Sequence, residues 1–494
     1  MPGSHHVRHR AVISSSQTRV VAGRGLAALV GIVLIGSACS PSPGTSADPS
    51  GTSDATPGAP LTSVEPWPTP PAAAGGDLDP AVADAVDKLV AAFTDARLDD
   101  EALATVAASG DARLGWLLSE MLRFITGGGF VEEDVLAAFT ELTGVDPRAD
   151  TRFGEVPWLA VTNLLIAWDT PAPPGYREAK ADLFLRMEPA WEPFFADADA
   201  AIDWRLISWG GVFIDDRPVG DRRPCARGCI PALDDPALTD ASGGDWYADD
   251  RIVFGVEVGG EAVAFPKHIM EVHEMVNLTV GGRRIGMPYC TLCGAAQAYL
   301  TDAVPDGVAT PLLRTSGLLS RSNKVMYDLE TWSVFNTFTG RALSGPLHDI
   351  GLVLEPVSVV TSTWGEWKAA HPDTRIVAED GGIGRSYPEE PLGGRDDDGP
   401  IFPIGQPDPR LPSQAQVLGV VDPDGRPLAF EVEQARAAIA AGQRVAIGEV
   451  EVISDGGGVR AIGPDGTAIP SHQAFWFAWS QFHPETALWI PGGS

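Results

Sequence analysis

The chain has 494 residues and carries 66 acidic against 35 basic side chains, which gives a formal net charge of −31. So large an excess of negative charge repels phosphate backbones and anionic lipid headgroups, and it excludes nucleic-acid binding and charge-driven membrane adhesion as the main function. Hydrophobic residues make up 44% of the chain, which is enough for two or three domains with well-filled cores.

Residues 1–38 have the pattern of a signal segment. Arginines precede an apolar run from Leu26 to Ile35, which is too short to cross a bilayer and suits the core of a signal peptide. Small residues then lead into Cys39, and this order resembles bacterial lipoprotein signals, whose cleavage leaves a lipid on the new N-terminal cysteine. The sequence therefore predicts an extracytoplasmic protein attached to the cell membrane through an acyl group on Cys39. An ordinary signal cut near Ala38, or an uncleaved anchor, is the alternative.

Two regions of different texture follow the signal. Residues 39–76 are rich in Pro, Ser, Thr and Gly, a composition that predicts a disordered tether. From 77 to 202, apolar residues recur at spacings of three and four, which predicts amphipathic helices. Glycine and proline interrupt these helices, so we expect a helical domain of short helical hairpins that loosely resembles a HEAT-type solenoid. The helical pattern runs on to about Asp215, and the tryptophans within it are expected to pack the interior, with ligand stacking as the alternative: Trp158, Trp168, Trp191, Trp204 and Trp209.

Residues 203–494 predict a larger α+β domain dominated by antiparallel strands. An alternating run at 251–258 turns at Gly259-Gly260 into a second run at 262–265, which is typical of a hairpin. A similar hairpin pattern begins at Val417, and each pattern is followed by a predicted helix, at 267–276 and at 433–441. This echo predicts a weak internal duplication, and its second copy has neither a His-Glu pair nor a Cys pair.

Several short motifs follow one another in this region: His273-Glu274 with Asn277, Tyr289-Cys290-Thr291-Leu292-Cys293-Gly294, Ser316-Gly317, Met326-Tyr327-Asp328, Trp364-Gly365-Glu366-Trp367, His371-Pro372 and Phe482-His483-Pro484. In this order they resemble the prokaryotic family catalogued as domain of unknown function 3179, over about residues 203–489. The resemblance implies no settled activity. The chain departs from the family pattern at Thr291, where Pro is usual, and at Arg314, where Gly is usual.

The residues expected to carry chemistry are Cys290, Cys293, His273 and Glu274. Two thiols three residues apart can form a disulfide, act as a redox couple or bind a metal, and simple packing is the remaining interpretation. As a metal site, Cys290 and Cys293 with His273 and His268 would suit copper or zinc. The spacing of His273 and Asn277 also places both on one face of the predicted helix.

Cys225 and Cys229 form a second close pair. An even number of cysteines outside the cytoplasm favours a local disulfide, and a four-thiolate zinc site with Cys290 and Cys293 is the competing interpretation. The sequence thus leaves two classes of function open. One is an enzyme or metal-handling protein centred on the Cys, His and Glu motifs; the other is a non-catalytic surface-binding module whose cysteines only form structural disulfides.

Overall fold

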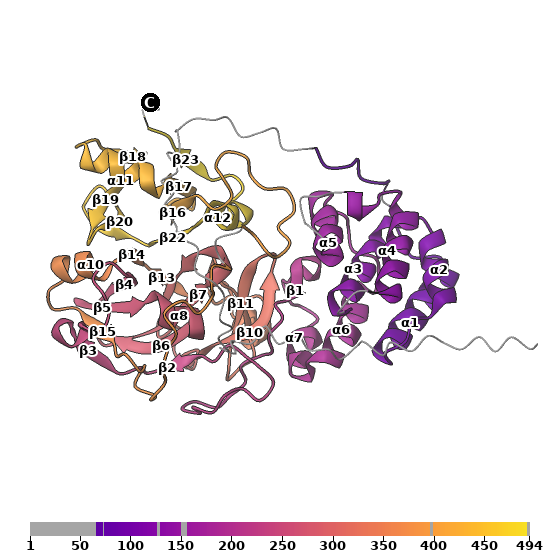
Figure 1. Ribbon diagram of the computed structural model, residues 1–494, viewed down its shortest axis with the longest axis horizontal. Coiled ribbons are helices and arrows are strands. Elements are labelled where there is room, and N and C mark those ends of the chain that lie inside the picture. Colours follow the sequence, from indigo (N-terminus) through magenta and orange to yellow (C-terminus); the bar gives the residue numbers. More distant parts are fainter. Residues whose placement is uncertain (1–65, 73, 126–128, 150–155, 396–398, 492–494) are drawn as a thin grey trace, which may run out of the picture.

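The computed structural model describes residues 66–491, apart from 73, 126–128, 150–155 and 396–398. The predicted signal, the lipid-attachment cysteine and most of the predicted tether lie outside these residues. A helical part stands beside a larger part built of sheets, so the α+β class is confirmed (Figure 1). Among the described helices, none is long and apolar enough to cross a membrane.

The helical part is built from amphipathic segments with clear end signals. The first helix has Pro80 at its start and the Asp79 carboxylate as its N-cap, and it buries Leu89 and Phe93. The fourth helix ends at Gly144, whose φ of 73° is the left-handed conformation that favours glycine. The helices are α1 (Pro80–Thr94), α2 (Asp100–Ala108), α3 (Gly115–Phe124), α4 (Phe130–Thr143), α5 (Pro157–Ala167), α6 (Tyr176–Met187) and α7 (Glu192–Ala196). A HEAT-type order for them stays a prediction.

The larger part contains five sheets, and most of its strand pairs are antiparallel, as the alternating patterns predict. In order across the sheet, the first has β1 (Ile207–Trp209), β10 (Leu313–Ser320), β11 (Asn323–Asp328) and β12 (Val334–Asn336), and the second has β13 (Glu355–Val357), β9 (Ala298–Leu300), β7 (Arg283–Cys290), β6 (Met275–Val280) and β2 (Leu233–Asp234), with β8 (Ala295–Ala296) paired to β7. The third sheet has β14 (Val360–Thr363), β4 (Ile252–Val258), β5 (Glu261–Pro266), β15 (Arg375–Val377) and β3 (Leu238–Asp240). The fourth has β22 (Ser471–Phe475), β16 (Gln416–Val421), β17 (Pro427–Glu431) and β23 (Ala487–Trp489), and the fifth has β18 (Val445–Ile447), β19 (Val450–Asp455), β20 (Gly458–Ile462) and β21 (Ala468–Ile469). The helices between them are α8 (Lys267–His273), α9 (Gly345–Asp349), α10 (Trp364–Ala370), α11 (Val432–Ala440) and α12 (Trp476–Phe482).

One apolar cluster continues from the helices into the sheet that holds β1, β10 and β11. The indole of Trp191 donates a hydrogen bond to the Ser316 carbonyl across this boundary, at 2.8 Å. Lys180, which is fully buried, makes an ion pair with Glu120 at 2.6 Å and also donates to the carbonyls of Trp204 and Ile207. The helical part is therefore fixed to the sheets by packing and by the hydrogen bond from the buried Lys180 ammonium to the Ile207 carbonyl on β1.

A loop from the sheets returns to the helical part and packs there. The amide side chain of Asn163 on α5 is buried, and its oxygen accepts hydrogen bonds from the backbone of Ile404 and Gly405, at 2.9 and 2.8 Å. Phe402 packs edge-on against Trp158, with ring centroids 5.9 Å apart. These contacts join segments about 240 positions apart in the sequence.

The two hairpins with similar sequences belong to sheets with the same strand order. The order β14-β4-β5-β15 in one sheet matches β22-β16-β17-β23 in the other. In both, the first two pairings are antiparallel and the last is parallel. The similarity thus extends beyond the hairpin and helix seen in the sequence to a second strand–helix–strand segment, β14-α10-β15 and β22-α12-β23.

A tryptophan packs on a glycine at the same place in each unit. A Cβ at Gly255 would overlap the ring of Trp367, and a Cβ at Gly419 would overlap the ring of Trp479. Each indole also donates to the hydroxyl of the threonine seven positions later, at 2.9 and 3.0 Å. Both glycines are therefore required by the close approach of the helix to the strand.

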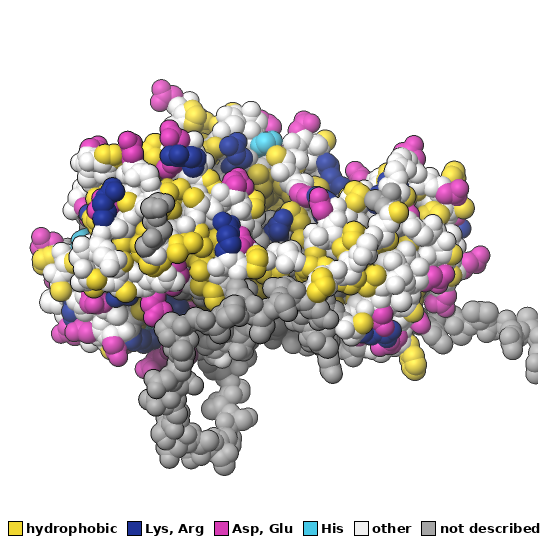
Figure 2. Space-filling model, turned by 90° about the horizontal axis from the view of Figure 1, so that it is seen from above, with side chains coloured by type: hydrophobic (Ala, Val, Ile, Leu, Met, Phe, Trp, Pro, Cys, Tyr) yellow, Lys and Arg dark blue, Asp and Glu magenta, His cyan; other side chains and the backbone are white. Residues whose placement is uncertain are grey.

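Acidic side chains are spread over the face of the molecule that Figure 2 displays. Figure 2 shows acidic side chains over the sheet part and the helical part on the face that it displays, with apolar side chains between them. Some of these charges are paired at the surface, as in Lys88 with Asp84 on α1, at 2.7 Å. On this face the net charge is therefore not gathered into one acidic patch.

Candidate functional site

The Cys290–Cys293 segment is a tight loop at the end of β7. The strand ends at Cys290, a single 3-10 turn covers Thr291–Cys293, and Gly294 reverses the chain with a φ of 57°. A Cβ at Gly294 would lie 3.0 Å from the ring of Phe475, so glycine is needed here for both backbone and space. The loop brings the two sulfur atoms to 2.8 Å from each other, and both cysteines are free thiols.

The thiols are buried under the turn between β10 and β11. The carbonyl of Ser322 in that turn accepts from Cys293 Sγ at 3.3 Å and from Cys290 Sγ at 3.7 Å. Cys293 has no exposed surface, and burial, with the neighbouring Cys290 as a second cause, raises its pKa well above the usual value for a thiol. Cys293 is therefore a neutral thiol at neutral pH.

Glu274 contacts this loop directly. Its carboxylate accepts a hydrogen bond from the hydroxyl of Thr291 at 3.0 Å and pairs with the ammonium of Lys324 at 3.1 Å. Lys324 also donates to the Glu274 carbonyl at 2.6 Å. The Glu274–Lys324 pair is almost completely buried, so its charged groups are stabilised by these bonds within the protein and not by contact with water.

The predicted helix over 267–276 is too long. It ends at His273, because Glu274 takes the left-handed conformation with a φ of 49° and the chain enters β6 at Met275. Asn277 therefore lies on a strand, and the expected shared helix face of His273 and Asn277 is wrong. The left-handed Glu274 is also what turns its carboxylate toward the cysteine loop while His273 stays on the helix.

Both histidines have partners outside the cysteine loop. His273 contacts the Pro231 carbonyl through Nδ1 at 2.6 Å and the Tyr387 hydroxyl through Nε2 at 2.8 Å. His268 stacks on Tyr247, with ring centroids 5.2 Å apart. Burial lowers the pKa of each imidazole to about 4, so both are neutral at neutral pH. The structure thus brings Glu274, and not the imidazole nitrogens, to the cysteine loop.

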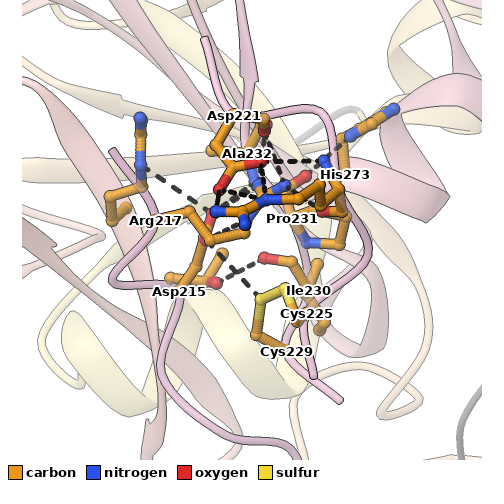
Figure 3. Close-up of a disulfide and its surroundings, with 12 residues drawn as sticks. Asp215, Arg217, Asp221, Cys225, Cys229, Ile230, Pro231, Ala232 and His273 are labelled. Atoms are coloured by element: carbon orange, nitrogen blue, oxygen red, sulfur yellow. Dashed lines mark hydrogen bonds and ion pairs between the residues drawn. A yellow bond between two sulfur atoms is a disulfide. The ribbon is translucent and has the colours of Figure 1, made fainter. Parts of the chain in front are cut away.

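The second cysteine pair forms the expected disulfide, between Cys225 and Cys229. Figure 3 shows it beside Asp215, whose Oδ1 lies 3.5 Å from the sulfur of Cys229. Asp215 is fully buried, pairs with Arg217 and accepts from the backbone of Ala232 at 2.7 Å. Among the described residues, Asp215 with this pair is the one group of three ligand-type side chains close enough to share a metal. Because its two sulfur atoms are bonded to each other, it is not a thiolate site.

A cavity of about 570 Å³ lies between the helical part and the sheets, and the cysteine loop forms part of its wall. Cys290, Thr291, Glu274 and Lys324 line it, and so do Cys225 and Cys229 of the second cysteine pair. Aromatic side chains from α5, from β1 and from the returning loop also line it: Trp158, Trp209 and Phe402. The volume is sufficient for a small molecule or for a side chain of a partner protein.

The contribution of the helical part to this cavity was missed from the sequence. Arg123, at the end of α3, lies in the cavity wall with its guanidinium 4.4 Å from the centre of the Trp158 ring. It donates to the Trp209 carbonyl, and burial lowers its pKa to about 10. The apolar residues of 114–125 recur at helical spacing, and the charged Arg123 among them was the signal available in the sequence. A buried arginine needs a specific partner, so its position indicated a special environment.

The fold and the site define an α+β protein with a buried pair of thiols, one of which lines a cavity between the helical part and the sheets. Residues 227–465 match the family model described as "Protein of unknown function (DUF3179)". The match confirms the resemblance over a shorter range than expected, and it includes the cysteine loop, Glu274 and Lys324. No curated protein and no solved structure matches the chain.

Two of the positions that depart from the expected family pattern, Thr291 and Arg314, make buried contacts in this chain. Thr291 supplies the hydroxyl that bonds to Glu274, which a proline could not do. Arg314 is buried and binds the carboxylate of Asp234 with two hydrogen bonds, at 2.9 and 2.6 Å. A bidentate pair of this kind is rigid, so the substitutions fix the surroundings of the site in a way specific to this chain.

Proposed function

We propose that the cavity is a thiol–disulfide exchange site, in which the Cys290–Cys293 dithiol passes two electrons to a disulfide or, once oxidised, takes them from a dithiol. The observation that carries the proposal is the geometry of the pair: two free thiols with their sulfur atoms 2.8 Å apart in the wall of a cavity. A disulfide bond is about 2.0 Å long, so the pair can close with a movement of less than about 1 Å. Exchange needs such a pair and an open approach to one sulfur.

The two cysteines have different roles in this proposal. The Cys290 thiolate attacks one sulfur of the substrate disulfide, forms a mixed disulfide and expels the other sulfur as a thiolate, which takes up a proton. Cys293 then loses its proton and attacks Cys290 Sγ, which forms the Cys290–Cys293 disulfide and releases the second substrate sulfur as a thiol. Glu274 and Lys324 are positioning residues, since they hold the loop through Thr291 and touch neither sulfur in the contacts described above.

Metal binding by Cys290, Cys293, His273 and His268 is the less well supported alternative. Two thiolates on a tetrahedral zinc ion lie about 3.8 Å apart, given a Zn–S distance of about 2.3 Å. The sulfur atoms here are closer than that, and both nitrogens of His273 already have protein partners. Copper or zinc binding would require the loop to open and His273 to leave its present bonds.

The proposed location of the protein in the cell rests on its signal-like segment and its disulfide. We infer that the signal-like segment directs it outside the cytoplasm and that an acyl group on Cys39 holds it at the cell membrane. The Cys225–Cys229 disulfide agrees with an oxidising compartment. The matching strand order of the two sheets suggests an internal duplication, and the exchange site belongs to the copy that carries the cysteine loop.

A trapping experiment tests the exchange site. The full mature chain with Cys293→Ser, which removes the second attack, is incubated with oxidised glutathione and its mass is measured. We expect the chain to take up one glutathione, whereas the matched Cys290→Ser variant stays unmodified because Cys293 is fully buried. Reaction of neither cysteine until the protein unfolds would show packed structural thiols and support the alternative of a non-catalytic surface module.

A further inference from the structure

The Cys225–Cys229 disulfide lines the same cavity as Cys290. We propose that this disulfide is the internal exchange partner of the Cys290–Cys293 dithiol, so that the two pairs form a relay between the protein surface and the buried thiols. The inference rests on the proposed exchange site and adds a second redox pair to it. It also names the immediate substrate, which is a disulfide within the same chain.

Hydrogen bonds to the end of α8 connect the two chain segments that carry the cysteine pairs. Two residues after Cys229, the carbonyl of Pro231 contacts Nδ1 of His273 at 2.6 Å. The next residue, Glu274, accepts from the hydroxyl of Thr291 at 3.0 Å, and Thr291 directly follows Cys290. The Pro231–His273 contact is visible in Figure 3. One helix end therefore fixes both loops at the same cavity.

The two pairs differ in exposure in the way a relay requires. Cys290 is 3% exposed and Cys293 is fully buried, whereas Cys225 and Cys229 are half-buried in a loop whose neighbouring residues are exposed. An outside thiol or disulfide can therefore reach Cys225–Cys229 more easily than the dithiol. Contacts of Arg227 with the helical part, including a 2.7 Å ion pair to Glu188, hold this loop at the cavity.

Asp215 determines which sulfur is attacked. Its carboxylate lies 3.5 Å from Cys229 Sγ, and a negative charge at that distance disfavours a thiolate on Cys229. Because the sulfur that leaves should be the better-stabilised thiolate, attack falls on Cys229 and expels Cys225. After the exchange, the thiol of Cys229 can donate its hydrogen to Asp215.

The exchange is balanced within the chain. Cys290 loses a proton and attacks Cys229 Sγ, which forms a Cys290–Cys229 bond and breaks the Cys225–Cys229 bond. Cys225 leaves as a thiolate and takes up a proton. Cys293 then loses its proton, attacks Cys290 Sγ and releases Cys229, which is protonated in turn. The dithiol has lost two electrons and the former disulfide has gained them, with no external oxidant.

A crosslink between the two loops tests the relay. In the full mature chain, Cys293→Ser with Cys225→Ser leaves Cys290 and Cys229 as free thiols, and mild oxidation should join them. In the matched control, Cys293→Ser with Cys229→Ser leaves Cys290 and Cys225, and we expect much less crosslink because the relay requires Cys290 to meet Cys229 and not Cys225. Peptide mass mapping without reduction identifies each bond, and unfolding midpoints show whether both variants are folded.

The wild-type chain gives a readout that does not depend on variant folding. After oxidants are removed, acid quenching and thiol labelling should find the two free thiols at Cys290 and Cys293 in some molecules and at Cys225 and Cys229 in others. Thiols confined to Cys290 and Cys293, together with no Cys290–Cys229 crosslink, would overturn the relay. The exchange site would still stand if glutathione reacts with Cys290 in the Cys293→Ser variant; reaction at neither place would overturn both.

Discussion

The hydroxyl of Thr291 donates a hydrogen bond to the carboxylate of Glu274, and this 3.0 Å contact ties the end of α8 to the cysteine loop. The same glutamate pairs with Lys324 on β11. The loop is therefore fixed from two elements that lie far apart in the sequence. The position of Cys290 in the cavity wall depends on this arrangement.

Loss of the Thr291 hydroxyl should loosen the loop. We expect Thr291→Val to lower the free energy of unfolding by about 1–3 kcal/mol, because a buried carboxylate oxygen loses its partner. The reaction of Cys290 with glutathione in the Cys293→Ser background should change in rate as the loop moves. Thr105→Val is the control, since that hydroxyl only bonds its own helix at the surface. Equal effects of the two substitutions would contradict a specific role for Thr291.

Lys180 should be among the most sensitive positions of the helical part. Removing one partner of a buried ion pair leaves an uncompensated charge, so we expect Lys180→Met to cost about 3–5 kcal/mol in urea unfolding. Lys88→Met, at an exposed pair on α1, should cost less than about 1 kcal/mol. Similar losses for the two variants would show that the buried bonds of Lys180, to Glu120 on α3 and to the Ile207 carbonyl on β1, contribute no more than an exposed pair.

The buried His273 should make the fold sensitive to acid. Burial lowers its folded pKa to about 4, while the unfolded value is about 6.5, so the unfolded chain takes up a proton first as the pH falls. Its contribution to stability is complete above about pH 6.5 and is lost progressively down to about pH 4, at up to about 1.4 kcal/mol per pH unit.

A histidine replacement isolates this effect. We expect His273→Gln to flatten the dependence of the unfolding free energy on pH between about 4 and 6.5. If His273→Gln lowers stability equally at all pH values in that window, the imidazole is not kept neutral by the fold.

The matching glycines of the two similar sheets should respond alike. Gly255→Ala and Gly419→Ala each force a methyl group into a tryptophan ring, and we expect a loss of about 1–3 kcal/mol for each by thermal unfolding. Gly75→Ala meets no atom within 4 Å and should be nearly neutral. A large loss at only one of the two glycines would show that the units are packed differently.

The membrane anchor is tested by cell fractionation. We expect Cys39→Ala to block lipid attachment, so that the protein is released from membranes or stays unprocessed. Ser42→Ala, three residues later, is the control and should leave the membrane fraction unchanged. Mature-size Cys39→Ala protein that remains with the membranes would contradict the anchor.

Local patterns in the sequence predicted helices and strands. The long-range contacts that form the cavity were not predictable from such patterns. The periodic apolar stripe of α1 and the glycine turn between β4 and β5 act over a few residues, so their residues specify them directly. The cavity instead depends on Phe402 meeting Trp158, 244 positions away, and no local preference encodes that contact. The sequence showed the cysteines, but not the wall opposite them.

Glu274 shows the same limit at the scale of one residue. A helix pattern continues through its position, and glutamate is a good helix former. Its left-handed conformation is maintained by Lys324 and Thr291, which come from other elements. Tertiary contacts therefore override local preference at the residue that links the predicted helix to the cysteine loop.

A redox titration of the thiols tests the central claim most directly. The mature protein is equilibrated in glutathione buffers of graded potential, quenched with acid, and its free thiols are counted and mapped. The account predicts that two thiols disappear together with a two-electron slope of about 30 mV per tenfold change, and that a Cys290–Cys293 disulfide appears. Two thiols that stay free at every potential, without a new disulfide, would contradict it.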